Sequence, residues 1–328
     1  MKLKNTNGAQ PARPKAKMSL DNFYEKELPL LADVVTFCNN LPMSLYADTT
    51  VVKSPEVVFR GSLLSQNRLV AEEYLLNFKR SEADLGVVIG TNNYSLPMAV
   101  GAVANRDLEE SEENLLSLPA PRNERAPIGP LIRSRRSVRS YSGKPVTMQD
   151  LSTLLSHCAG VTGRLHLDNP PENTVLGNTT HVDLRAAVSG GGLYPVDLYL
   201  IAVNVEQLAA GPYRYLSKHH ALKPLGSSVP ELRRLAQFVD IQVERSAFLI
   251  CYLYNFFENS RKYGESGTGF AFIESGAIAA HVHLMCTALG LGSCDVGGFA
   301  KQKFERIFGA DGLSKHMIHL TVVGQTGE

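Results

Sequence analysis

A continuous apolar run, SAFLICYLYN at residues 246–255, is the feature that most constrains how this chain folds. Its length and its branched and aromatic side chains predict a β-strand. Because apolar residues do not alternate with polar ones, both faces of the strand are expected to be covered. We therefore expect this strand at the centre of a sheet that has helices packed around it.

Segments on either side of this run continue an alternation of helices and strands. Thr147 followed by Asp150 is a capping-box pattern, which predicts a helix that begins there and ends at Gly160. Further elements are predicted as strands at 193–203 and 316–324, a hairpin at 211–226 and a buried, alanine-rich helix at 274–292. The order predicts a sheet flanked by helices.

The chain changes character at residues 107–130, where five acids in 107–113 precede a proline-rich stretch without periodicity. This composition is typical of a linker. Residues 19–106 before it have helical apolar spacing and short β-branched runs, and predict an accessory domain for peptide or partner binding. Residues 1–18 carry five cations, two prolines and no acid, which predicts a disordered basic tail. We therefore expect the catalytic and binding residues within residues 131–328.

Charge and composition exclude several classes of protein. Lysine and arginine total 33 against 32 acids, a net charge of +1, which speaks against a dedicated nucleic-acid binder. The N-terminus lacks the apolar core of a secretory signal, and no apolar run approaches the roughly 18 residues of a membrane span. None of the five cysteines has C-x-x-C spacing, so we expect them to be buried as small apolar side chains and not to form disulfides or a zinc site. We therefore expect a cytoplasmic protein with no nucleic-acid or membrane partner.

The stretch RSRRSVRSY at 133–141 gathers four arginines in a predicted loop or helix end. Arginine forks form charge-assisted hydrogen bonds to phosphate, although a solvated basic surface is the alternative interpretation. The stretch has neither the P-loop nor the dinucleotide fingerprint. His281 and His283 stand two residues apart on the predicted helix and do not share a face, so no metal site is expected.

Two glycine-rich stretches would let backbone approach a flat or anionic ligand: VSGGGLYP at 188–195 and ALGLGSCDVGGF at 288–299. The alternatives are a turn before a strand and a helix cap followed by a turn. A fourth stretch, 258–272, is predicted as a glycine-rich loop that carries Lys262 and Tyr263. A lysine of lowered pKa near a tyrosine can act as a base, and solvated loop charges are the alternative. His219 and His220 are predicted in a surface turn.

In this order the four stretches resemble the FMN-dependent dehydrogenases of the nitroreductase superfamily, over about residues 131–328. Within it they most resemble the azoline dehydrogenases of the SagB/ThcOx type, which include the microcin and streptolysin enzymes. The resemblance implies an α+β fold, with a mixed sheet flanked by helices, an N-terminal accessory α/β domain and a homodimer with a flavin at each interface. The residues that it implies for FMN are Arg135, Arg136, Ser137 and Arg139 at the phosphate, together with Ser189, Gly190, Gly191, Asp295, Val296, Gly297 and Gly298.

The resemblance further implies that Lys262 and Tyr263 are the catalytic pair. The implied reaction is the oxidation of thiazoline or oxazoline rings to thiazole or oxazole in a ribosomally made peptide of the bacteriocin kind. A hydride passes to the flavin and Lys262 accepts a proton. A precursor peptide and cyclodehydratase subunits are the expected partners. Two alternatives stay open: an NAD(P)H-dependent nitro- or flavin-reductase, and a flavin-bound scaffold subunit of the cyclising complex.

Overall fold

The computed structural model of the chain describes residue 74 and residues 114–166, 181–232, 235 and 240–327. The predicted tail at 1–18, nearly all of the predicted accessory domain at 19–106 and the first part of the predicted linker lie outside the described residues. Those expectations therefore stay predictions, and so does the boundary between the domains.

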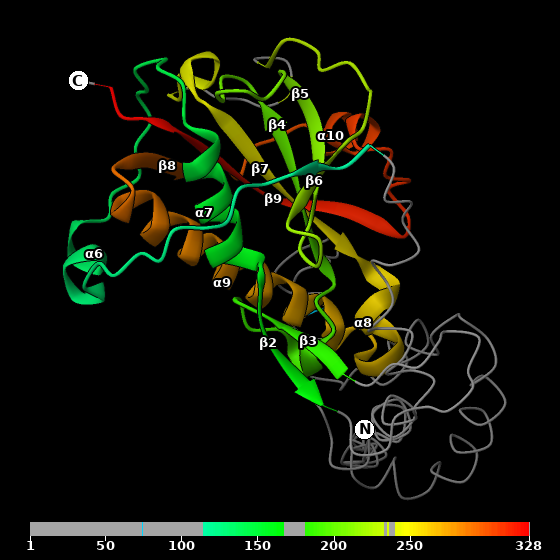
Figure 1. The fold of residues 1–328 in the computed structure, drawn as a ribbon. Helices are drawn as coiled ribbons and strands as arrows, with labels where there is room; N and C mark the ends of the chain where they lie inside the picture. Colours follow the sequence, from blue (N-terminus) through cyan, green and yellow to red (C-terminus); the bar gives the residue numbers. More distant parts are fainter. Residues whose placement is uncertain (1–73, 75–113, 167–180, 233–234, 236–239, 328) are drawn as a thin grey trace, which may run out of the picture. The chain divides into compact units, whose positions relative to one another are not determined.

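A seven-stranded sheet forms the centre of the described region (Figure 1). Neighbouring strands pair antiparallel throughout. Parallel contacts are present as single bridges, which join Ser137 to Ser293 and Val146 to Val205. The predicted α+β fold with a mixed sheet flanked by helices is confirmed. In spatial order the strands are β1 (Leu116–Ser117), β6 (Ala221–Pro224), β5 (Gly211–Leu216), β4 (Val196–Ala202), β7 (Phe248–Asn255), β9 (Lys315–Gln325) and β8 (Leu291–Asp295).

Strand β7 is the apolar run from which the fold was predicted. It lies between β4 and β9 and is buried along nearly its whole length. The strands predicted at 193–203 and 316–324 are β4 and β9, and the predicted hairpin is β5 with β6. A separate two-stranded sheet pairs β2 (Val161–His166) with β3 (His181–Arg185).

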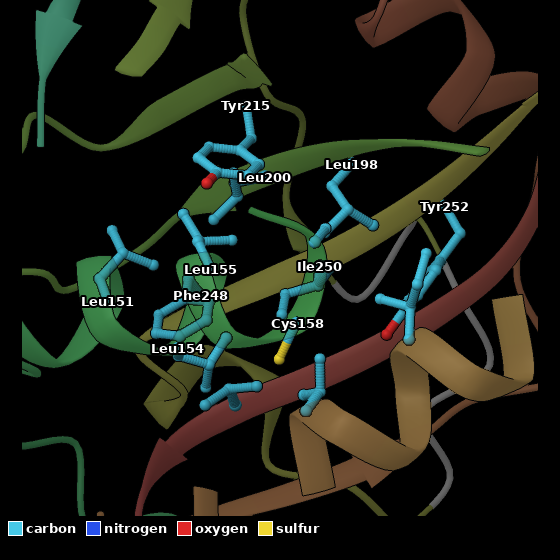
Figure 2. Packing of buried hydrophobic residues seen from close by; sticks show 14 of the residues in the cluster. Leu151, Leu154, Leu155, Cys158, Leu198, Leu200, Tyr215, Phe248, Ile250 and Tyr252 are labelled. Atoms are coloured by element: carbon cyan, nitrogen blue, oxygen red, sulfur yellow. The ribbon is translucent and has the colours of Figure 1, made fainter. Parts of the chain in front are cut away.

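Helices cover both faces of the large sheet. α7 (Met148–Ala159) and α9 (Ser266–Ala288) pack into the larger apolar cluster on one face, and α10 (Lys301–Ile307) packs into the cluster on the other. Figure 2 shows leucines of α7 meeting side chains of β4 and β7 in the larger cluster. By length and composition α9 could also cross a membrane, contrary to the sequence expectation, but such composition is typical of core helices too. Two more α-helices of the described residues are α6 (Ile128–Ser134) and α8 (Phe256–Tyr263).

Truncating a leucine of α7 is expected to destabilise the domain strongly. Leu154 is fully buried in the larger cluster, so Leu154→Ala should lower the free energy of unfolding by about 2–5 kcal/mol. Leu313 is 80% exposed, and Leu313→Ala should change it by less than about 0.5 kcal/mol. Urea unfolding followed by circular dichroism measures both. Equal effects of the two substitutions would contradict this description of the core.

The ends of α7 follow the predicted capping pattern. The Thr147 side chain accepts a hydrogen bond from the Asp150 backbone amide at 3.0 Å and donates one to the Asp150 carboxylate at 2.7 Å. Gly160 ends the helix in an extended conformation, at φ −70°. A Cβ there would lie 2.6 Å from the Ser156 carbonyl oxygen. Glycine is therefore required by close backbone approach and not by a left-handed turn.

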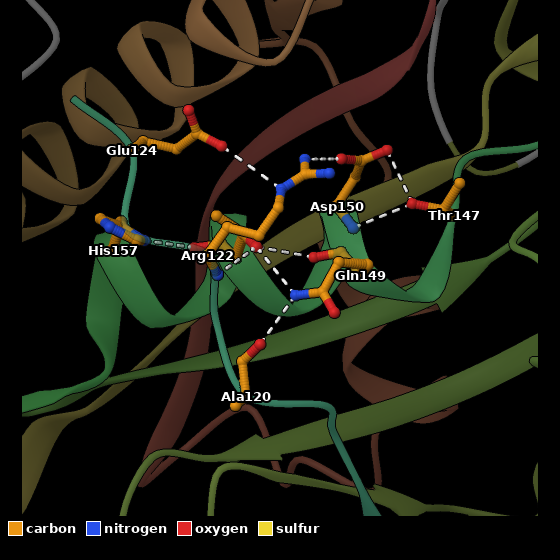
Figure 3. Close-up of polar contacts among 8 residues, drawn as sticks. Ala120, Arg122, Glu124, Thr147, Gln149, Asp150 and His157 are labelled. Carbon is orange, nitrogen blue, oxygen red and sulfur yellow. Dashed lines mark hydrogen bonds and ion pairs between the residues drawn. The ribbon is translucent and has the colours of Figure 1, made fainter. Parts of the chain in front are cut away.

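Within the described part of the predicted linker, residues 114–130, the stretch from Ala120 to Arg122 lies along α7 (Figure 3). The backbone amide of Arg122 donates to the Thr153 hydroxyl at 3.1 Å, and its guanidinium pairs with Asp150. Gln149 donates to the Ala120 carbonyl at 2.7 Å. These contacts hold the segment against the domain, so this part of the chain packs on α7 as an ordered strap.

His220 is not the surface residue that the sequence predicted. Its ring is half-buried and lies 2.8 Å from the Ser152 hydroxyl and 3.0 Å from the Tyr215 hydroxyl. Its Nε2 also lies 3.2 Å from the Pro119 carbonyl oxygen. The imidazole thus joins α7, the hairpin and the strap of residues 114–130. The hairpin sequence alone gives no sign of this, because Ser152 and Pro119 are distant in sequence.

We expect the stability of the domain to fall in mild acid through His220. Burial lowers the pKa of His220, and the hydrogen bond to Pro119 offsets this in part. Since the unfolded chain binds the proton at about pH 6.5, the favoured neutral form stabilises the fold above that pH. The stabilisation is lost as pH falls from about 6.5 towards the folded-state pKa. Thermal unfolding between pH 7.5 and 5.5 should show a larger loss of Tm in the wild type than in His220→Gln. His219→Gln should behave as wild type, and an unchanged profile in His220→Gln would contradict the expectation.

Two predictions about local structure were wrong. The stretch 258–272 is not a loop, because it contains the end of α8 and the start of α9. A Cβ on Gly267 would lie 2.9 Å from the Asn259 side-chain oxygen. Glycine at this position therefore permits close packing of the two helices. The helix predicted at 274–292 begins earlier, at Ser266, and ends at Ala288, and residues Leu291–Asp295 form the edge strand β8.

Candidate functional site

Lys262 and Tyr263 lie at the C-terminal end of α8, against the glycine-rich stretch before β4. Gly191 has φ +65°, and a Cβ at that position would lie 2.8 Å from Lys262 Nζ and would overlap the Tyr263 hydroxyl. Both side chains are half-buried, so they remain partly accessible. The structure thus brings together residues of two separate predicted stretches, which we call the lysine–tyrosine cluster: Gly190, Gly191, Lys262, Tyr263 and Phe270.

Aromatic packing fixes the tyrosine of this cluster. The Tyr263 ring meets the Phe270 ring edge to face, with centroids 4.9 Å apart. Lys262 Nζ lies 5.2 Å from the centroid of the Tyr263 ring, a cation–π contact. A Cβ on Gly190 would lie 3.2 Å from Phe270, so the glycine loop also rests on that ring. Phe270, from the first turns of α9, is a member of the site that the sequence did not single out.

Hydrogen bonds hold the glycine loop in place. The Ser189 hydroxyl accepts from the Tyr194 amide at 2.9 Å, and the Tyr194 hydroxyl accepts from the Arg185 amide at 3.0 Å. Glu274, a buried residue of α9, accepts from the Val196 amide at 3.1 Å. The loop is therefore anchored at its start, in its middle and where β4 begins. Ser189 forms the turn through its acceptor and keeps its O–H free to donate.

The predicted phosphate residues lie on an extended segment that follows α6. This segment runs beside β8, since the Val138 amide donates to the Ser293 carbonyl at 2.9 Å and Ser137 bridges Ser293. Gly292 permits the approach, because a Cβ there would lie 2.7 Å from the Val138 side chain. The arginine stretch and the second glycine stretch, distant in sequence, are thus neighbours in the fold.

The four predicted phosphate residues differ in what their side chains contact. Arg136 donates to the carbonyls of Arg133 and Arg135, at 2.8 and 2.7 Å, and so covers the end of α6. Within the described part of the chain, Arg135, Ser137 and Arg139 have no side-chain hydrogen bond or ion pair. We call these three residues the basic cluster.

The second glycine stretch ends in open backbone, beyond the strand that contacts the segment of the basic cluster. Gly297 and Gly298 are exposed, and a Cβ on either would meet no atom within 4 Å. The Val296 side chain is buried in the core, and its amide donates to the Leu320 carbonyl at 2.9 Å. Bare backbone at 297–298 therefore faces outward, while Val296 anchors it.

Asp295, at the end of β8, is the acceptor of a network that local sequence spacing did not predict. Its carboxylate lies 3.0 Å from His283 Nε2 and 3.2 Å from His319 Nε2. The Thr321 hydroxyl donates to it at 2.7 Å. Burial raises the pKa of Asp295, but the hydrogen bonds from the two histidines and the threonine outweigh it and hold the pKa well below its usual range. Pairing of β8 with β9 places Asp295 opposite Thr321, and α9 supplies His283.

The two clusters lie towards opposite ends of α9 (Figure 1). The lysine–tyrosine cluster includes Phe270, and the Ser293 side chain beside the basic cluster contacts His283 at 2.7 Å. These two positions of α9 are thirteen residues apart, which at about 1.5 Å per residue is roughly 20 Å. No group of three potential metal ligands occurs in the described ranges, and His281 does not share the contacts of His283.

Comparison with known proteins identifies relatives of this region. The family model described as "Nitroreductase family" matches residues 132–325. The curated protein of Methanocaldococcus jannaschii named "Putative nitroreductase MJ1384" is 26% identical over 193 residues, which cover 58% of this chain and 89% of that protein.

Similar solved structures come from two bacteria. A crystal structure from Ralstonia eutropha JMP134, described as that of a putative nitroreductase, is 22% identical with a TM-score of 0.50 and covers 67% of this chain and 92% of that chain. A chain of the Escherichia coli microcin synthetase McbBCD complex, with truncated pro-MccB17 bound, is 18% identical with a TM-score of 0.46. The alignment covers 80% of this chain and 100% of that chain. At 22% identity the similarity to the Ralstonia eutropha structure shows the fold alone, and nothing is concluded from the similarity to the Escherichia coli chain.

Proposed function

Because this chain belongs to the nitroreductase family, we propose that it is an FMN-dependent oxidoreductase that converts thiazoline or oxazoline rings of a peptide to thiazole or oxazole. The observation that carries the proposal is the packing of Lys262 and Tyr263 against Gly191. The bare backbone at Gly191 lets the proposed general base pack closely against the loop. A Cβ on the next residue, Gly192, would meet no atom within 4 Å, which leaves room beside the base for a flat substrate ring.

The described residues fit an FMN group. Arg135, Ser137 and Arg139 supply free donors of the kind that bind phosphate, on a segment fixed to β8. The exposed backbone at Gly297 and Gly298 offers a surface that a flat ring can approach closely. When bound, FMN supplies an acceptor for a hydride.

The residues of the chain then have separate tasks in ring oxidation. Lys262 Nζ accepts the proton that leaves a carbon of the azoline ring. The Tyr263 hydroxyl, next to Lys262 and supported by Phe270, orients the ring or relays the proton. Gly190 and Gly191 let Phe270, Lys262 and Tyr263 pack against the loop backbone. The hydrogen bonds that Ser189 and Glu274 accept keep the loop in place.

We propose that the working unit is a homodimer. The roughly 20 Å between the two clusters along α9 separates the proposed base from the proposed phosphate site within one chain. A second copy in the opposite orientation would bring its own lysine–tyrosine cluster to the first chain's basic cluster. Large apolar side chains are exposed on two helices, and a second copy of the chain would cover them. They are Phe272 and Ile273 on α9, and Ile128 and Ile132 on α6. A precursor peptide and cyclodehydratase subunits complete the proposed set of partners.

Purified protein and a peptide that contains azoline rings test the proposal. The protein should be yellow, release FMN on denaturation and lower the mass of the peptide by about 2 Da per ring, the mass of the hydride and proton removed. A protein that stays colourless and takes up no added FMN would exclude the cofactor. Oxidation of NAD(P)H with a nitro compound, while the peptide is unchanged, would favour the reductase alternative. Cyclisation that needs the protein without any ring oxidation would favour the scaffold.

A further inference from the structure

We propose that Asp295 is a tuning residue: a fixed negative charge that disfavours the reduced form of the bound flavin and so lowers its reduction potential. The inference rests on the proposed function, because it needs FMN at the basic cluster. It goes beyond that function in assigning a redox role to a network that contacts neither Lys262 nor Tyr263 in the described structure.

The first support is the number of donors that converge on one carboxylate. His283 from α9, His319 from β9 and the Thr321 hydroxyl all contact Asp295, at 3.0, 3.2 and 2.7 Å. A carboxylate that accepts three side-chain hydrogen bonds is held in its charged form and in one orientation. The depressed pKa of Asp295 agrees with this geometry.

The second support is the direction of the network. The Ser293 hydroxyl lies 2.7 Å from His283 Nδ1, and the Tyr252 hydroxyl lies 3.0 Å from Thr321 Oγ1. If each outer hydroxyl donates inward, His283 Nε2 and Thr321 keep their own protons for Asp295. Every bond then points toward the same carboxylate, which is the final acceptor. Tyr252, Ser293 and Thr321 are buried, so the supports are rigid.

The third support is the position of the carboxylate. Asp295 is two residues beyond Ser293, whose backbone pairs with the segment of Arg135, Ser137 and Arg139. It directly precedes the open backbone at 297–298, and its side chain is 40% exposed. The charge is therefore held at the end of β8 where the flavin is proposed to lie, rather than hidden in the core.

The effect follows from the charge balance. A hydride taken from the azoline ring brings two electrons and one proton, so the reduced form carries one more negative charge than the oxidised form. The Asp295 carboxylate repels that charge over several ångströms, and removing it relieves the repulsion. A lower potential favours onward transfer of the two electrons to an oxidant such as oxygen.

The reduction potential of bound FMN tests this in the full chain, by equilibration with a reference dye and the flavin absorbance. Asp295→Asn should favour the reduced form by at least tenfold, which is about 30 mV upward for a two-electron couple. Asp295→Glu keeps the negative charge, so its reduction potential should equal that of the wild type. If Asp295 had only a structural role, Asp295→Glu and Asp295→Asn would shift the potential alike. Glu206→Gln removes an exposed carboxylate in the loop after β4 and should change nothing.

The outcomes separate the inference from the proposed function. If all variants retain FMN and all have the wild-type reduction potential, the tuning role is overturned and the proposed function is not. A wild-type protein that binds no FMN would overturn the proposed function and the inference with it. If Asp295→Asn does not fold, Asp295→Ser serves as the second neutral variant, and the same shift is expected.

Discussion

Replacing Lys262 by alanine is expected to slow azole formation by about 100- to 10,000-fold, the loss typical of removing a general base. The protein should still bind FMN, because the basic cluster, and not Lys262, is proposed to hold the phosphate. Mass spectrometry of the azoline peptide over time measures the rate, and flavin absorbance measures the retained cofactor. Loss of FMN together with activity would mean that Lys262 belongs to the cofactor site instead.

Two further variants sharpen this test. Arg261 is the preceding residue on α8 and is exposed, so Arg261→Ala is a matched control that should retain the wild-type rate. Tyr263→Phe keeps the edge-to-face packing on Phe270 and removes only the hydroxyl. A large loss assigns a chemical role to the hydroxyl, whereas a small loss assigns the ring to packing. Wild-type turnover by the Lys262→Ala, Tyr263→Phe double variant would refute the catalytic assignment.

Replacing Arg135 or Arg139 by alanine is expected to weaken FMN binding by about tenfold to a hundredfold for each residue. The physical reason is the loss of one charge-assisted hydrogen bond to phosphate, which is about 1.5–3 kcal/mol. Quenching of flavin fluorescence on titration into the apoprotein measures the dissociation constant. The catalytic rate at saturating FMN should change much less than the affinity.

Arg136 provides the internal comparison for this prediction. Its guanidinium already donates to the carbonyls at the end of α6, so Arg136→Ala should cost less FMN affinity than Arg135→Ala or Arg139→Ala. Riboflavin, which lacks the phosphate, should bind wild type and the Arg139→Ala variant alike. If all three variants lost equal affinity, or if riboflavin showed the same loss, the phosphate would lie elsewhere.

Local sequence patterns predicted the central strand and the first helix packed on the sheet. The uninterrupted apolar residues of β7 could be recognised because burial on both faces leaves a direct trace in the sequence. The cap of α7 could be recognised because Thr147 and Asp150 interact across one turn. Both signals depend only on near neighbours, and both agree with the structure.

Other features depend on contacts that near neighbours do not encode. The glycines at 264–269 suggested a loop, but Gly267 is needed where α8 and α9 approach each other closely. The network around Asp295 exists only because β8 pairs with β9 and thereby aligns Asp295 with Thr321. Proximity of Lys262 to Gly191 likewise needs the whole domain, since about seventy residues separate them.

The unbroken course of α9 has a consequence for how the chain can vary in length. An inserted or deleted residue between Phe270 and His283 would turn the rest of the helix by about 100° and shift it by about 1.5 Å. His283 would then point away from Ser293 and Asp295, while Phe270 would stay against the glycine loop. Insertions at the surface of the domain carry no such penalty. The distance and angle between the two clusters are therefore fixed by the number of residues between Phe270 and His283. We expect this number to tolerate no insertion or deletion.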